Sequence, residues 1–233
     1  MQDARAFDDF SHHTRYGYFD KTAENFCQLI KEGQSLKTVL ATMLKTVAPI
    51  LHVPSHRRII NGEFSLVNYD HATLAMRGGV QLMRYLPDEW KYLPMTQAMW
   101  YTPQGLDVWA QRQGKFPGHY AGKTPNDFDE IPEPTVWYPE QAPFTKGDFD
   151  ARLEDYFTSI IEGESIKAYA LFLGLAEEKD PEKRKRLLDQ TLYAVIIDIE
   201  ETIVRRQTRN TGHKTFRVRA MIELTKYLGW ENA

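Results

Sequence analysis

Two stretches of the chain resemble each other, and this internal similarity constrains the fold more than any other feature. Residues 68–86 align without a gap on residues 210–228, and a shorter pair of blocks, 32–37 and 162–167, precedes them in the same order. The identical pairs in the longer block are Asn68/Asn210, His71/His213, Thr73/Thr215, Arg77/Arg219, Leu82/Leu224, Tyr85/Tyr227 and Leu86/Leu228. Because an internal repeat sets the architecture of a chain, we expect two related halves.

Apolar residues recur at three- and four-residue spacing through most of the chain, a pattern typical of amphipathic helices. No stretch of any length alternates between apolar and polar residues as a half-buried strand would. The sequence therefore predicts an all-α fold, an internally duplicated helical bundle that forms a single domain over residues 1–233. Its halves would be about 21–86 and 150–229, joined by a long connecting segment over 87–149.

Residues that favour helix ends divide the bundle into separate helices. Gly33 is expected to end one helix and Ser35 to cap the next, which should stop near His52 because Pro54 follows. Asp180 followed by proline predicts the start of a helix that runs to about residue 208. Further helices are expected over 21–32, 68–86, 95–113, 148–162, 165–175 and 212–228.

The middle of the connecting segment, residues 115–146, is rich in proline and aromatic residues. Loops of this length in compact domains are usually functional or disordered. The aromatic side chains, among them Trp137 and Tyr138, argue against disorder. We expect an ordered strap across the helices that serves as a lid or as an oligomer contact, with His119 placed to close over a pocket.

Composition excludes several classes of partner. A net charge of −3 and a pI near 6.2 disfavour nucleic-acid binding. Cys27 is the only cysteine, so no disulfide within the chain and no cysteine-based zinc cluster can form. No apolar run has the roughly 20 residues that span a membrane, and the N-terminus lacks a signal-peptide pattern. We expect a cytoplasmic protein that forms a homo-oligomer such as a homodimer and acts on a small molecule.

A histidine occupies the same position in each expected half, in the first turn of a helix. The apolar stripes expected to point inward behind His71 and His213 are Ala75, Gly78, Leu82 and Tyr85 or Leu86 in the first helix, and Phe216, Ala220, Leu224 and Tyr227 in the second. If the halves pack about a pseudo-twofold axis, the two imidazoles approach each other and suit a transition metal or a haem iron. The alternative is that each histidine caps its helix through a hydrogen bond to the backbone.

Carboxylates and further histidines supply other candidate ligands. The helix around residues 192–204 is apolar on every side up to Ile199, so Asp198 would be buried, which is costly unless the carboxylate is paired or binds metal. Glu201 shares its face but has an alternative partner in Arg205, four residues further on. His52 and His56 stand four apart, although the intervening proline disturbs the helical geometry.

Arginines at matched positions, Arg77 and Arg219, each follow a matched threonine by four residues. An arginine at an equivalent place in each half could bind a carboxylate or phosphate. The interpretation that we favour is an ion pair between helices.

The sequence contains no glycine-rich phosphate loop, no GxGxxG and no GxSxG, so a tightly bound nucleotide is not indicated. The two Glu-x-x-His motifs of ferritin-like di-iron proteins are also missing. The helices that begin at His71 and His213 and end in Tyr-Leu slightly resemble those of the questin-oxidase-like oxygenases. This resemblance assigns no residue a role.

These observations lead to one functional hypothesis and two alternatives. We expect a metal-dependent oxidoreductase, using iron or haem, that oxidises a small apolar or aromatic substrate at a buried site between the halves. Its catalytic residues would be His71, His213 and His119, and its metal ligands would come from His52, His56, His71, Asp198, Glu201 and His213. The first alternative is a metal-free helical binding or assembly protein with structural histidines. The second is cofactor-free acid–base catalysis by a paired histidine and aspartate.

Overall fold

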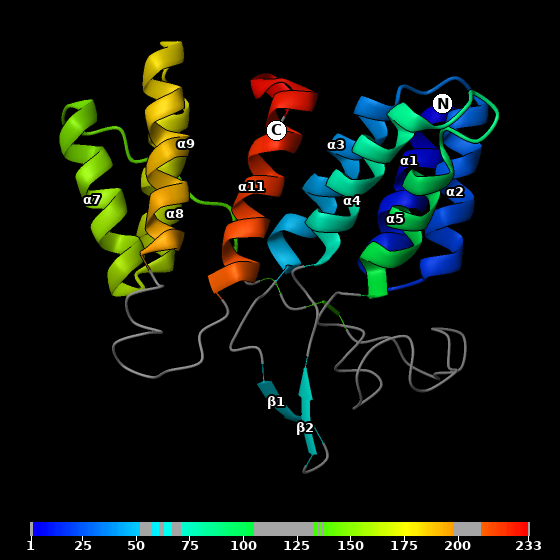
Figure 1. The fold of residues 1–233 in the computed structure, drawn as a ribbon, viewed down its shortest axis with the longest axis horizontal. Coiled ribbons are helices and arrows are strands. Elements are labelled where there is room, and N and C mark those ends of the chain that lie inside the picture. The colour runs from blue at the N-terminus through cyan, green and yellow to red at the C-terminus, as the bar shows by residue number, and fades with distance from the viewer. Residues whose placement is uncertain are drawn as a thin grey trace. The chain divides into compact units, whose positions relative to one another are not determined.

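A computed structural model describes most of the chain, and the account below concerns those residues. They are 2–51, 57–60, 63–66, 71–104, 133–134, 136, 138–197 and 211–232. The chain divides into two compact units, each of which is considered by itself (Figure 1). Unit 1 comprises Met1–Trp137 together with Glu223–Ala233, and unit 2 comprises Tyr138–Ile222.

Unit 1 is built mainly from helices. They are α1 (Gln2–Arg15), α2 (Phe19–Lys31), α3 (Leu36–Val47), α4 (His71–Leu82) and α5 (Leu93–Gln104), and the 3-10 turns η1 (Ala48–Ile50) and η2 (Met83–Tyr85) extend α3 and α4. Between α3 and α4 in the sequence, β1 (Arg57–Ile60) and β2 (Glu63–Leu66) pair as an antiparallel hairpin. The C-terminal end of α11 (Thr211–Leu228) and the turn η4 (Trp230–Asn232) also belong to this unit.

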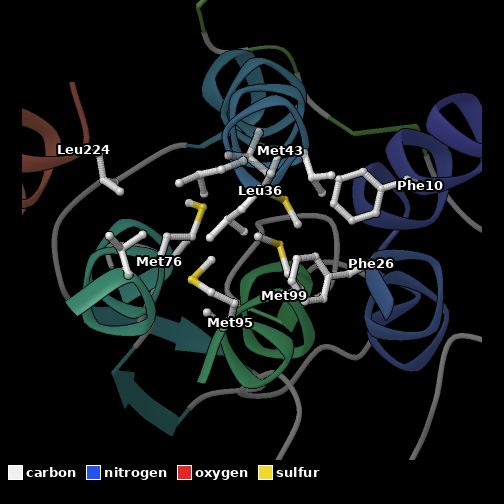
Figure 2. Close-up of a cluster of buried hydrophobic side chains, with 14 of the residues drawn as sticks. Phe10, Phe26, Leu36, Met43, Met76, Met95, Met99 and Leu224 are labelled. Atoms are coloured by element: carbon white, nitrogen blue, oxygen red, sulfur yellow. The ribbon is translucent and has the colours of Figure 1, made fainter. Parts of the chain in front are cut away.

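The core of unit 1 is apolar and rich in methionine (Figure 2). Helix α5 packs against both α2 and α4, and α1 packs against α2 and α3. The largest fully buried side chains are Phe10, Phe26, Leu29, Leu40, Met43, Ile50, Met76, Met95 and Met99. Leu224 and Leu228 bring the end of α11 into the same cluster. Because the buried cluster consists of apolar side chains, the hydrophobic effect is the main force that holds these helices together.

Unit 2 contains α7 (Phe149–Glu162), α8 (Ser165–Ala176), α9 (Pro181–Ile196) and the first part of α11. Helix α7 packs against α8 and α9. The guanidinium of Arg152, a residue only 8% exposed, donates hydrogen bonds to the Gly174 carbonyl at 2.9 Å and to the Glu178 carboxylate at 3.0 Å. A buried charge needs partners of this kind, because water no longer solvates it.

The described end of the predicted strap lies against α8. The backbone N–H of Phe144 donates to the carbonyl of Ala170 at 2.9 Å. A Cβ atom added to Gly174 would lie 1.9 Å from the Phe144 carbonyl oxygen, so this close approach requires glycine. The predicted strap over 115–146 can be followed only in this part, because most of that range lies outside the described residues.

The described residues confirm a helical fold, with the β1–β2 hairpin as the exception. Several predicted helix ends are also confirmed. Gly33 adopts a left-handed φ of 87° after α2, and the Ser35 hydroxyl accepts the Thr38 N–H at 3.1 Å. Asp180 caps α9 by accepting the Glu182 N–H at 2.9 Å. These ends depend on local chemistry, which the sequence displays directly.

Other boundaries differ from the prediction. Helix α3 ends at Val47 rather than near His52, because Pro49 lacks an N–H and continues the chain as a 3-10 turn. Helix α9 ends at Ile196, and residues 198–208, over which the sequence predicts that it continues, lie outside the described part of the chain. Helix α1 was not expected at all. Its sequence is largely polar, and Phe10 is its one fully buried large side chain within the described residues.

The predicted inward stripe of α4 is wrong. Leu82 is 54% exposed and Tyr85 is 82% exposed. The buried positions of α4 are instead Ala72, Thr73, Met76, Gly79 and Val80. A Cβ atom on Gly79 would lie 2.4 Å from the Met95 sulfur, so α4 turns this small-residue face to α5 and approaches it closely.

The internal duplication is not confirmed. Leu82 is 54% exposed whereas its sequence match Leu224 is 1% exposed. Tyr85 projects into solvent whereas its match Tyr227 is half-buried. The second expected half, 150–229, is moreover shared between the two units. In the described parts of the chain, no helix is both long enough and apolar enough to span a bilayer.

Candidate functional site

His71 is the predicted site residue whose side chain the structure describes. It is the first residue of α4 and is half-buried. Its Nδ1 lies 3.3 Å from the hydroxyl of Tyr101 on α5, and the two ring centroids are 6.4 Å apart. The imidazole therefore contacts a neighbouring helix through a polar group, which suits a structural link as well as proton transfer.

The other predicted residues are not brought together by the described structure. His213 lies near the start of α11, in unit 2, and its side chain is outside the described part. His52, His56, His119, Asp198 and Glu201 all lie outside the described residues. Within the residues that are described, no group of three or more His, Cys, Asp or Glu side chains is placed to hold a metal ion. The predicted metal site stays a prediction.

The cleft with the most distinctive chemistry lies in unit 1, between α3, α4 and the end of α11. It has a volume of about 460 Å³ and is lined by Lys37, Arg77, Val80, Gln81, Arg84, Glu223, Leu224, Lys226 and Tyr227. This size falls within the usual range of small-molecule sites. We call it the basic cleft, because four of its lining residues are cationic and one is acidic.

Glu223, the acid among these lining residues, is already held by two side chains of α4. Arg77 donates to its two carboxylate oxygens at 2.5 and 3.2 Å, and the Gln81 amide donates at 2.6 Å. This ion pair joins α4 to α11 and confirms for Arg77 the interpretation that we favoured from the sequence. A bidentate contact of this kind also fixes the position of the carboxylate.

The remaining cations have no acidic partner among the described residues. Lys37, Arg84 and Lys226 line the cleft, are exposed, and form no ion pair with any acid that the structure describes. The Lys37 ammonium lies over the Tyr227 ring, 5.4 Å from its centroid. Lys226 lies in the last turn of α11, where a cation also stabilises the helix dipole. Positive charge among the lining residues is thus in excess of the negative charge that the cleft itself supplies.

The floor of the basic cleft is apolar. Val80 is 7% exposed and Leu224 is 1% exposed. Tyr227 is half-buried beside them, and burial raises the pKa of its phenol, with a further rise from Tyr92 and an opposing effect of Arg84. At neutral pH the phenol therefore stays protonated and can donate a hydrogen bond. A ligand in the cleft would meet both cations and apolar or aromatic surface.

A second cavity, of about 340 Å³, lies on the α7–α8 hairpin of unit 2. Its aromatic lining residues are Tyr138, Tyr156, Tyr169 and Phe172. Burial raises the pKa of Tyr156, and the hydroxyl of this residue is already hydrogen-bonded to Thr191 at 2.9 Å. Because none of the described lining residues is charged, this cavity offers little to orient a ligand.

Sequence reasoning missed most of the basic cleft. Arg77, Gln81 and Arg84 recur at a spacing of four and then three, which places them on one face of α4 and was a usable signal. No local sequence pattern indicates that these residues share a cleft with Glu223 and Tyr227, which lie near the C-terminal end of the sequence.

Comparisons with known proteins assign no family. No family model matches the chain, and neither a curated protein nor a solved structure shows significant similarity to it.

Proposed function

We propose that this is a helical binding protein whose basic cleft holds a small organic anion with an apolar or aromatic body. The observation that carries the proposal is the excess of cations over an apolar floor. Lys37, Arg84 and Lys226 are without acidic partners among the described residues, and they line the same cleft as the buried side chains of Val80 and Leu224. Cations placed around a partly apolar cavity favour a ligand that carries both features.

Each part of the cleft would have a separate role. Arg84 and Lys226 would contact the anionic group, since a guanidinium and an ammonium are the usual partners of carboxylates and phosphates. The Tyr227 ring and the Val80 and Leu224 side chains would contact the body of the ligand. Glu223 would keep Arg77 in place, because it already accepts two hydrogen bonds from that guanidinium.

Isothermal titration calorimetry with phenyl phosphate as the probe tests this proposal, with benzyl alcohol as the uncharged analogue. We expect phenyl phosphate to bind and benzyl alcohol to bind at least tenfold more weakly. In the double variant R84Q/K226Q, the affinity for phenyl phosphate should fall at least tenfold, because a hydrogen bond to a charged group contributes about 1.5–3 kcal/mol. Raising the salt concentration should weaken binding to the original protein.

Lys31→Gln is the matched control for the lysine. Lys31 is exposed in the last turn of α2, as Lys226 is in the last turn of α11, but it does not line the cleft. Its replacement should leave the affinity unchanged. Equal binding by the original protein and by R84Q/K226Q, with both folded by circular dichroism, would contradict the proposal, and so would an absence of binding to the original protein.

The metal-dependent oxidoreductase predicted from the sequence remains a separate hypothesis, and so does acid–base catalysis. Among their residues, the described structure supports only a contact of His71 with Tyr101. Elemental analysis and an absorption spectrum of the purified protein test the first of them. The calorimetry above, repeated in a chelator, shows whether anion binding depends on a metal.

A further inference from the structure

The corner between α4 and α5 carries a group of large apolar side chains that face solvent. Their exposed fractions are 54% for Leu82, 82% for Tyr85, 37% for Leu86, 55% for Trp90 and 57% for Leu93. We call these five residues the corner patch. Single exposed apolar residues are ordinary on protein surfaces, but a concentration of them in one place marks an interaction surface.

The backbone of the corner keeps these side chains near one another. Tyr85 follows Leu82 by three residues, a spacing that places the two side chains on one side of the 3-10 turn η2, and Leu86 follows directly after that turn. The Trp90 N–H donates to the Pro87 carbonyl at 2.9 Å, and the Leu93 N–H donates to the Trp90 carbonyl at 3.0 Å. The chain therefore turns tightly between α4 and α5, and the patch is a compact surface.

Within residues 82–93, which carry the corner patch, the charges are balanced. Arg84 and Lys91 are the cations, and Asp88 and Glu89 are the acids. Lys91 pairs with the almost fully exposed Asp88 at 3.1 Å, and Glu89 accepts the indole N–H of Trp90 at 2.8 Å. An anionic surface or an acidic partner would be repelled by the acids as much as attracted by the cations. A surface with equal numbers of both signs can instead complement itself.

We infer that two copies of this chain associate through the corner patch in a twofold contact. In such a contact the same surface is used by both partners, so each apolar side chain meets apolar surface and each acid can face a base of the other copy. This inference does not depend on the proposed anion site. It rests on the exposed apolar residues and on the charge balance of the corner.

The exposed apolar residues in the described part of unit 2 are not concentrated in one short segment. They are Phe144, which precedes α7, and Ile161, Ile166, Tyr193, Ile196, Phe216 and Met221, which are distributed over α7, α8, α9 and α11. Phe157 already stacks on Tyr193, with ring centroids 5.7 Å apart. These residues serve as a reference against which the corner can be tested.

Sedimentation equilibrium over a range of protein concentrations tests the inference. We expect a monomer–dimer equilibrium for the original protein. Leu82→Glu and Tyr85→Glu should each raise the dimer dissociation constant at least tenfold, because each places an acid in the apolar contact. Both side chains are more than half exposed, so the monomer should keep its fold, which circular dichroism checks. Ile166→Glu, at a residue 44% exposed on α8, is the matched control and should leave the constant unchanged.

A charge-exchange experiment tests the contact in a second way. Within residues 82–93, the variant D88K/E89K carries only cations and the variant R84E/K91E carries only acids. Each should dimerise at least tenfold more weakly alone than in an equimolar mixture of the two. A protein that stays monomeric at every concentration would overturn the inference. It would also be overturned by a dimer that Leu82→Glu and Tyr85→Glu leave unchanged, or by a mixture that associates no better than its components.

Discussion

Unit 1 and unit 2 are both made of packed helices, but they bury different chemistry. Among the described residues of unit 1, the buried polar side chains are four threonines, and the hydroxyls of Thr14 and Thr102 donate to carbonyls of their own helices, those of Phe10 and Ala98, both at 2.8 Å. Unit 2 buries the guanidinium of Arg152, whose partners come from α8 and from the residue Glu178 that follows it. The first unit depends on apolar contact, and the second also depends on a directional network.

This difference bears on how each unit should respond to mutation. Apolar packing is non-directional, and methionine in particular adapts to changes in shape. A buried ion pair is sensitive to the loss of one partner, because the other charge is then left without compensation. The effect of a core mutation on the free energy of unfolding should therefore depend mainly on side-chain volume in unit 1. In unit 2 it should depend more on whether buried groups keep their hydrogen-bond partners.

The largest effect is expected in the core of unit 1. Met99→Ala should lower the free energy of unfolding by about 2–5 kcal/mol, because it leaves a cavity at a fully buried site. Met99→Leu is the matched control and should cost less than about 1.5 kcal/mol, since it keeps the volume. Urea denaturation followed by circular dichroism measures both. Hydrogen exchange should become faster in α2 and α5, and equal acceleration in α7 and α8 would contradict the separation of the units.

An intermediate effect is expected from the network of unit 2. Glu178→Gln should destabilise the protein by about 2–3 kcal/mol, less than the ~3–5 kcal/mol of a fully buried pair, because Glu178 keeps some contact with water. Arg152→Met should cost less, since it removes the buried charge and leaves Glu178 paired with Lys183 at 3.2 Å. Urea denaturation ranks the two variants. If Arg152→Met proves the more harmful, packing by the arginine side chain rather than its charge is what unit 2 requires.

The smallest effects compare a glycine in each unit. Gly174→Ala should destabilise by about 1–3 kcal/mol, because its Cβ would collide with the Phe144 backbone. Gly78→Ala should instead stabilise by about 0.5–1 kcal/mol, since nothing lies within 4 Å of its Cβ and alanine is the better helix former. Thermal unfolding measures the sign of each change. A stabilising Gly174→Ala would show that the strap does not press on α8.

Local features were predictable and tertiary ones were not. The ends of α2, α3 and α9 follow from Gly33, Ser35 and Asp180, whose side chains or backbone act within one turn. The buried face of α4 could not be chosen from the sequence, because Met76 and Val80 form one apolar stripe and Gly78 and Leu82 another. The close approach of Gly79 to Met95 decides between them.

The same division holds for the candidate site. The sequence placed Arg77, Gln81 and Arg84 on one face of a helix, because helical periodicity alone fixes that arrangement. It could not show that Glu223, Leu224 and Tyr227 complete the cleft, since these residues lie far along the chain. Helical periodicity and capping residues were enough to predict that the chain is helical and where several helices begin and end. Which apolar faces are buried and which cations share a cleft became visible in the folded chain alone, because both depend on contacts between residues that are distant in sequence.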